Sequence, residues 1–106
     1  MNLKDLQTHA LKIANSYQEL NMKNKGKSWT ETDYMSGFVG DVGDLSKIVM
    51  AKNGLRQMDS IDAKLAHELS DCLWSILVLS ANYKVDLEKE FLKTMEELAV
   101  RIKKQI

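Results

Sequence analysis

Residues 67–80 read "HELSDCLWSILVLS", and this stretch decides the class of fold. Drawn as a helix, it continues a stripe of apolar residues that consists of Leu65, Leu69, Cys72, Ile76 and Leu79. In its second half, Trp74, Leu77 and Val78 fill the remaining sides. A helix that is apolar all round has to be covered all round, and the rest of so short a chain offers few partners. The sequence therefore predicts a helical protein that forms a homodimer.

Two helices are predicted before this central one. The first covers residues 3–20, and the second begins at Ser28 or Thr30, each of which is followed three residues later by an acid. The second helix ends at Lys52, because the Asn-Gly pair that follows is a typical C-terminal signal. The apolar face of the first helix comprises Leu3, Leu6, Ala10, Ile13, Ala14, Tyr17 and Leu20.

The central helix begins at Asp59 or Ser60 and reaches about residue 83, and Asp86 caps a fourth helix. The apolar stripe of this fourth helix consists of Leu87, Phe91, Met95, Leu98 and Ile102. The predicted fold class is all-α, as a four-helix bundle that is completed by homodimerisation. Residues 1–106 are expected to form a single domain.

Composition narrows the classes of function. No Pro and only five Gly leave little material for a loop-rich β-fold. The 15 basic and 15 acidic residues cancel, so the positive field that binds nucleic acid polymers non-specifically is missing. The single cysteine, Cys72, excludes an internal disulfide and suits a reducing compartment. No leader opens the chain and its apolar runs are too short to span a bilayer, so we expect a cytoplasmic protein without a membrane partner.

Two pairs of acids stand three residues apart. Residues 37–48 read "GFVGDVGDLSKI", in which Asp41 and Asp44 fall within the apolar side of the helix. Glu68 and Asp71 form the second pair, at the border of the central stripe. If the two helices pack antiparallel, the four carboxylates converge, and their repulsion then requires protons or cations. Oxygen ligands suit Mg²⁺ or Mn²⁺, whereas either pair alone would more often be a solvated face or a cap.

The two acidic motifs resemble those of a known family. "DVGDL" at residues 41–45 resembles the E-x-x-E motif, and "ELSDCLW" at residues 68–74 matches the E-x-x-D motif, of the MazG-like all-α nucleoside triphosphate pyrophosphohydrolases. "ILVLSANYKVDLEKEF" at residues 76–91 is similar to the end of that family's third helix and the start of its fourth. Both glutamates of the first motif are aspartates here, one methylene shorter.

The resemblance implies a dimer or tetramer that cleaves an NTP or dNTP between its α- and β-phosphates. The products would be the nucleoside monophosphate and pyrophosphate. The implied ligands of one or more Mg²⁺ or Mn²⁺ ions are Asp41, Asp44, Glu68 and Asp71. Asp41 or Asp44 would also have the catalytic role of orienting or deprotonating the attacking water.

Candidate substrate contacts precede the first acidic helix. Lys23, Lys25 and Lys27 lie in the predicted loop 21–30 and suit the outer phosphates as point charges, although solvated loop lysines would give the same pattern. Trp29 is expected either to stack on a base or to pack over the helix start as a hydrophobic staple. These four residues are the predicted substrate-binding positions on this side of the site.

The fourth helix departs from the family pattern. The family carries a Lys and an Asn there that meet substrate, and this chain has Thr94 and Leu98 instead, so Lys93 is the candidate that partly substitutes. Two other residues have a structural interpretation. His67 is expected at the surface, because neither acid pair has the Glu-x-x-His spacing of a helical di-iron site. Cys72 is expected to pack as a small apolar side chain.

Three classes of function are compatible with these patterns. The first is a Mg²⁺-dependent nucleotide pyrophosphohydrolase, which is the leading hypothesis. The second is a relative that keeps the fold and the dimer but acts as a nucleotide-binding or regulatory module. The third is a structural helical protein whose acids only accept hydrogen bonds. Metal binding separates the first two from the third, and turnover separates the first from the second.

Overall fold

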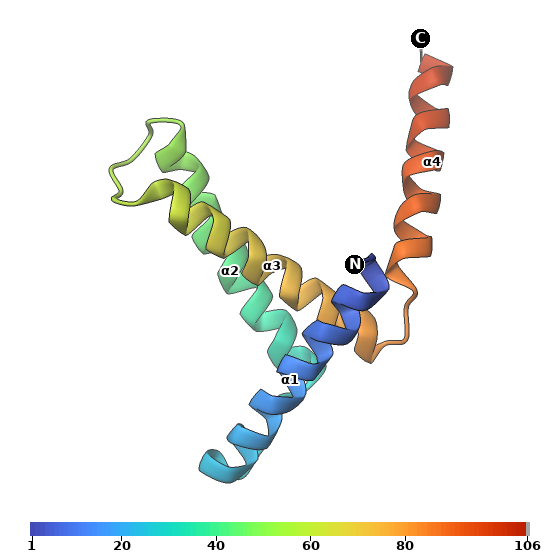
Figure 1. Cartoon of the computed structure of the whole chain (residues 1–106). Coiled ribbons are helices and arrows are strands. Elements are labelled where there is room, and N and C mark those ends of the chain that lie inside the picture. The colour runs from blue at the N-terminus through green and yellow to red at the C-terminus, as the bar shows by residue number, and fades with distance from the viewer. Residues whose placement is uncertain (106) are drawn as a thin grey trace.

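The computed structural model describes residues 1–105, which form four α-helices and no β-strand. The helices are α1 (Leu3–Lys25), α2 (Glu31–Lys52), α3 (Ile61–Asn82) and α4 (Leu87–Gln105) (Figure 1). The predicted all-α class is confirmed for this part of the chain. The predicted end of the second helix at Lys52 is confirmed as well.

Side-chain caps determine where three of the helices begin. Asn2 and Asp5 exchange side chain–backbone hydrogen bonds at the start of α1, and Thr30 and Asp33 do the same at the start of α2. Oδ1 of Asp86 accepts a hydrogen bond of 3.2 Å from the backbone N–H of the third residue of α4. Each cap satisfies backbone donors that the first turn of a helix leaves unpaired. Of the predicted starts, those at Thr30 and Asp86 are confirmed.

Two other boundaries differ from the prediction. α1 does not end near residue 20 but continues to Lys25, because residues 21–25 contain no Gly or Pro. It ends at Gly26, whose φ of 71° is left-handed and whose N–H donates to the carbonyl of Met22. Ser60 precedes α3 as predicted, but it has a φ of 53° and its side chain caps nothing.

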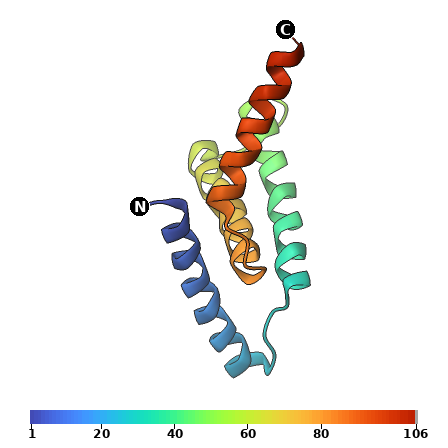
Figure 2. The same cartoon turned by 90° about the vertical axis from the view of Figure 1, so that its right-hand side faces the viewer.

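α3 lies at the centre of the molecule. α2 and α3 run antiparallel as a helical hairpin, and α1 packs against α3 (Figure 1, Figure 2). Val78 of α3 has no exposed surface. The buried apolar cluster around it consists of Ala10, Ala14, Tyr34, Leu77 and Val78. Two alanines on α1 give the helix a small contact surface, which lets the backbones of α1 and α3 approach closely.

The predicted apolar face of α1 is only partly buried. Ala10 and Ala14 are buried, but Leu6, Ile13, Tyr17 and Leu20 are between 37% and 55% exposed. The buried side is shifted toward Gln7, which is 7% exposed. Nε2 of Gln7 donates to Oγ of Ser80 over 2.8 Å and to the carbonyl of Val85 over 3.2 Å. These bonds tie α1 to the turn from which α4 departs.

α4 stands apart from the other three helices. Leu87 at its start packs against the buried cluster and its other contacts are mainly with α1, none of its residues is buried, and it projects away from the hairpin (Figure 1). The radius of gyration is 17.0 Å, whereas a compact chain of this length would have about 13 Å. The single chain therefore packs three helices together and leaves the fourth uncovered.

Candidate metal centre

The antiparallel hairpin brings acids of α2 and α3 together. One carboxylate oxygen from each of Asp41, Asp44 and Glu68 lies within 4.8 Å of the others. On α2 the two aspartates are three residues apart, so both project from the side that faces α3. Asp71, one turn beyond Glu68, forms a second group with Glu68 and His67 under the same distance limit. The four acids singled out in the sequence therefore form one cluster, linked through Glu68.

The four acids differ in how far they are buried. Glu68 is 8% exposed, Asp41 and Asp71 are half-buried, and Asp44 is exposed. The prediction that both acids of α2 are covered is wrong for Asp44, because α3 covers only one edge of the apolar side of α2. Glu68 accepts no hydrogen bond and forms no ion pair within residues 1–105. Glu68 is the least exposed of the four acids and has no protein partner for its charge, so it is the residue that gains most from a cation or a proton.

The electrostatics of the cluster favour bound protons. Loss of solvent raises the pKa of the Glu68 carboxyl, and the charges of Asp41, Asp71 and Asp44 raise it further. The pKa of Asp41 is also raised, first by burial and then by Asp71 and Asp44. His67 opposes both shifts, because its imidazolium form stabilises the ionised carboxylates. A divalent cation would have the same effect as these protons, and more strongly.

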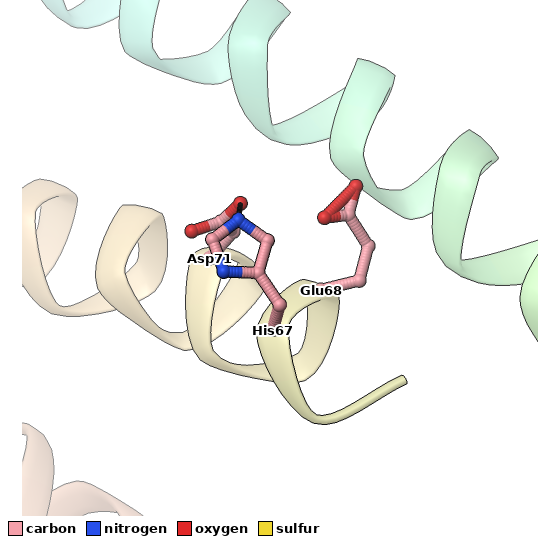
Figure 3. Close-up of side chains that lie close together, drawn as sticks. All are labelled: His67, Glu68 and Asp71. Carbon is pink, nitrogen blue, oxygen red and sulfur yellow. Dashed lines mark ion pairs between the residues drawn. The ribbon is translucent and has the colours of Figure 1, made fainter. Parts of the chain in front are cut away.

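His67 was expected at the surface, and its side chain is indeed 76% exposed. Its Nε2 nevertheless lies 3.1 Å from Oδ2 of Asp71 (Figure 3). The sequence search for a histidine three residues after an acid did not find this pair. The signal that would have found it is the spacing of four residues from His67 to Asp71, which places the two side chains on one face of α3.

An aromatic pocket of about 600 Å³ adjoins the acids, and Asp41 and Asp71 form part of its wall. Its other lining residues are Ile13, Tyr17, Asn21, Trp29, Tyr34, Ser70 and Trp74. The ring of Tyr34 lies edge-to-face with Trp29 at 5.4 Å and with Trp74 at 6.0 Å between centroids. Tyr17, Tyr34 and Trp74 were not predicted as site residues. Their helical spacing is that of core residues, and only the packing of α1 and α2 on α3 brings them to one pocket.

Trp29 is held at the mouth of this pocket by Gln18 of α1. The backbone N–H of Trp29 donates to Oε1 of Gln18 over 2.6 Å, and Nε2 of Gln18 donates to the Trp29 carbonyl over 2.9 Å and to the Tyr34 hydroxyl over 2.7 Å. The indole also covers Gly37, where an added Cβ would lie 3.5 Å from the ring. The staple alternative is confirmed, since Trp29 packs over the first turns of α2, and the residue keeps 46% of its surface exposed beside the pocket.

The predicted lysine contacts are not brought to the acids in the single chain. Lys23 and Lys25 belong to the last turn of α1, so their assignment to a loop is wrong, and only Lys27 lies in the connection to α2. All three are exposed, and none lines the aromatic pocket. Lys93 lies on α4, which stands apart from α2 and α3, beside Glu96.

Comparison with models of protein families, with curated proteins and with solved structures gives no match for this chain. The site therefore has to be judged on its own residues. Among residues 1–105, no helix combines the length and apolar character needed to cross a membrane. What the geometry provides is a partly buried carboxylate cluster next to an aromatic pocket, on rigid helices.

The raised pKa values lead to a testable dependence of stability on pH. In the absence of metal, Asp41 and Glu68 bind protons more tightly in the folded than in the unfolded state. Their stabilising contribution to the free energy of unfolding is therefore fully present at pH values below the ordinary pKa values, 3.8 for Asp41 and 4.5 for Glu68. It is lost as the pH rises through the raised pKa values of the folded state. Urea unfolding with a chelator present should show this loss.

The control for this prediction is the variant with both Asp41→Asn and Glu68→Gln. Subtracting its free energy of unfolding from that of the wild type at each pH isolates the two carboxyls. The difference is expected to become less favourable to the wild type as pH rises from about 4 toward neutrality. A difference that is independent of pH, or that changes in the opposite direction, would show that the cluster does not retain protons.

Proposed function

We propose that this protein is a Mg²⁺-dependent nucleotide pyrophosphohydrolase that cleaves an NTP or dNTP into the monophosphate and pyrophosphate. The observation that carries the proposal is Glu68, a residue that is 8% exposed and has no hydrogen-bond or ion-pair partner among residues 1–105, beside Asp41 and Asp71. Like charges held this close in a rigid site are stabilised either by protons or by a cation, and a divalent cation does so at neutral pH. The resemblance of both motifs to the MazG-like family points to the same chemistry.

The donor set fits a hard divalent ion. Asp41, Asp44 and Glu68 offer only oxygen atoms, which Mg²⁺ and Mn²⁺ prefer, and exposure of Asp44 leaves room for water and for phosphate oxygens. When bound, Mg²⁺ would neutralise charge on the phosphates and lower the pKa of a coordinated water. Asp44 is the better placed of the two aspartates to accept the proton of the attacking water, because it reaches solvent, while Asp41 and Glu68 are held by packing.

The aromatic pocket would bind the base. Its volume of about 600 Å³ is in the ordinary range for small-molecule sites, and four of its nine lining residues are aromatic. Trp29 is 46% exposed and would stack on the base, while the edge-to-face contact with Tyr34, which in turn contacts Trp74, holds its indole in place. Asp41 and Asp71 belong to both the pocket and the carboxylate cluster, so a nucleotide with its base in the pocket would direct its phosphates to the acids.

A second copy of the chain would complete the fold. Phe91, Met95, Leu98 and Ile102 form one stripe along α4 and are between 38% and 60% exposed. Their spacing of four, three and four residues is that of the buried seam between paired helices. α3 also leaves apolar side chains uncovered at Leu69, Leu73 and Ile76. We therefore propose a homodimer or tetramer, in the cytoplasm, in which these surfaces face each other.

The test is a panel of hydrolysis reactions. Purified protein is incubated with Mg²⁺ or Mn²⁺ and each common NTP and dNTP, and the monophosphate and pyrophosphate are quantified. The proposal expects both products in equal amounts, only when metal is present, and with a preference among bases. Release of inorganic phosphate and a nucleoside diphosphate instead would place the cleavage at another bond and contradict it.

One observation favours the alternative of a nucleotide-binding or regulatory dimer. Lys23, Lys25 and Lys27 do not line the pocket, so the single chain offers the outer phosphates no cationic side chain there. Nucleotide binding without turnover in the panel, measured by calorimetry with Mg²⁺ present, would select this alternative. A structural protein would show neither binding nor turnover, and its unfolding would not respond to Mg²⁺.

A further inference from the structure

The carboxylate of Glu68 belongs to two groups of potential ligands. With Asp41 and Asp44 it forms an all-oxygen group between α2 and α3, and with His67 and Asp71 it forms a group that includes a nitrogen. We propose that His67, Glu68 and Asp71 form a second metal position, adjacent to the first and sharing Glu68 with it. We further propose that this position, because it includes a nitrogen ligand, selects a first-row transition ion such as Mn²⁺, Co²⁺ or Zn²⁺ over Mg²⁺. The inference rests on the proposed function in one respect, namely that the first position binds metal.

The distances within the second group suit coordination. Two ligand atoms at about 2.1 Å from an ion and at right angles to each other are about 3.0 Å apart, and ligands on opposite sides are about 4.2 Å apart. Nε2 of His67 lies 3.1 Å from Oδ2 of Asp71, and a Glu68 oxygen completes the group within 4.8 Å. The spacing of His67 and Asp71 already matches that of two adjacent ligands, so an ion could replace their present contact, and a side-chain rotation of Glu68 would bring its oxygen to the third ligand position.

The helix explains why this geometry arises. His67 and Asp71 are four residues apart, so they lie one above the other on α3, and Glu68 lies next to both (Figure 3). All three ligands come from one rigid element, and no movement of α2 is needed to assemble them. His67 is 76% exposed, which gives an ion access from solvent and leaves coordination positions for water or phosphate.

Glu68 is the observation that separates this group from an ordinary surface cluster. Its side chain is more than nine-tenths buried, it has no hydrogen-bond partner within residues 1–105, and its carboxylate points toward α2 (Figure 3). A carboxylate has two oxygens with about four lone-pair sites, so Glu68 can serve both positions at once. Pairs of ions about 3.5–4 Å apart are the common arrangement in enzymes that displace a group at phosphorus.

The donor atoms decide which ion fits each position. Imidazole nitrogen favours transition metals such as Mn²⁺, Co²⁺ and Zn²⁺ relative to Mg²⁺, which prefers oxygen and keeps its waters. The first position has no nitrogen ligand, whereas the second has His67. Mg²⁺ and a transition ion would therefore partition between the two positions instead of competing equally for both.

Electron spin echo envelope modulation of Mn²⁺-loaded protein tests coordination by His67 directly, because the method detects a nitrogen nucleus bound to the ion. The chain has two histidines, so His67→Gln removes the proposed ligand and His9→Gln, at an exposed site on α1, is the matched control. The wild type and His9→Gln are expected to show modulation from ¹⁴N, and His67→Gln is expected to lose it. Mn²⁺ binding by His67→Gln should weaken by at least about tenfold, since loss of even an orienting residue costs 10–100-fold.

Thermal unfolding with Mg²⁺ distinguishes failure of this inference from failure of the proposed function. The expected result is that Mg²⁺ stabilises all three proteins to the same extent, because the first position does not use His67. Equal stabilisation by Mg²⁺ together with no ¹⁴N modulation and unchanged Mn²⁺ affinity would overturn the second position and leave the first intact. No response of the wild type to either ion would overturn the metal centre as a whole.

Discussion

Glu68→Gln is expected to reduce nucleotide hydrolysis by at least about 10²–10³-fold and to abolish stabilisation by Mg²⁺. The amide keeps the shape of the side chain but removes the charge that both ligand groups share. Loss of one group that stabilises charge in a transition state typically costs this much in rate. The measurement is the initial rate of pyrophosphate release at saturating metal, together with the midpoint of thermal unfolding with and without Mg²⁺.

The same substitution should not destabilise the metal-free protein at neutral pH. Asp41, Asp44 and Asp71 repel the ionised Glu68, and a neutral amide removes that repulsion. Glu19→Gln is the matched control, because Glu19 is an exposed glutamate of α1 that is distant in sequence from the cluster and lines none of its groups. Glu19→Gln should keep both the rate and the response to Mg²⁺. Unchanged hydrolysis by a folded Glu68→Gln protein would contradict the assignment of the site.

Leu98→Asp is expected to convert the assembly to monomers. Leu98 lies in the middle of the exposed stripe of α4, and in a symmetric dimer each copy would contribute one aspartate to the interface. Two charges placed in an apolar interface cost about 2 kcal/mol or more each, which together weaken association by roughly 10³-fold. Sedimentation equilibrium over a range of concentrations measures this shift.

Val100→Asp is the matched control for this second prediction. Val100 lies two residues further along α4, about half a turn away from the stripe, and is 48% exposed. Val100→Asp also replaces an apolar side chain by aspartate, but on the face of α4 opposite the apolar stripe, so the dimer should persist. A monomeric wild type would contradict the proposed interface, as would a Leu98→Asp protein that associates as tightly as Val100→Asp.

The number and order of the helices could be predicted from the sequence because their signals are local. Thr30 with Asp33 and the cap at Asp86 act within a single turn, so they determine helix starts independently of the remaining fold. The end of α1 was missed because lysine and asparagine are common in loops, although nothing before Gly26 interrupts a helix. A polar composition indicates that a segment is exposed to solvent, but it does not distinguish a loop from the exposed end of a helix.

Burial could not be predicted as well, because it depends on what lies opposite each face. Periodicity correctly assigned Ala10 and Ala14 to the inner side of α1, but in the described part of the chain Leu6 and Leu20 remain 37% and 50% exposed. The same reason explains the acids. Spacing indicated that Asp44 and Glu68 project toward each other, whereas only the packing of the hairpin leaves the first exposed and the second buried.

The buried amide of Gln7 bears on how two copies would associate. Because it bonds to Ser80 and to the carbonyl of Val85, α1 holds the turn before α4 in addition to the few contacts that α4 itself makes. α4 thus leaves the body in a fixed direction before any partner arrives. The orientational entropy of α4 is therefore lost when the chain folds and not when two copies associate. More of the contact energy of the apolar stripe of α4 is then available as binding affinity.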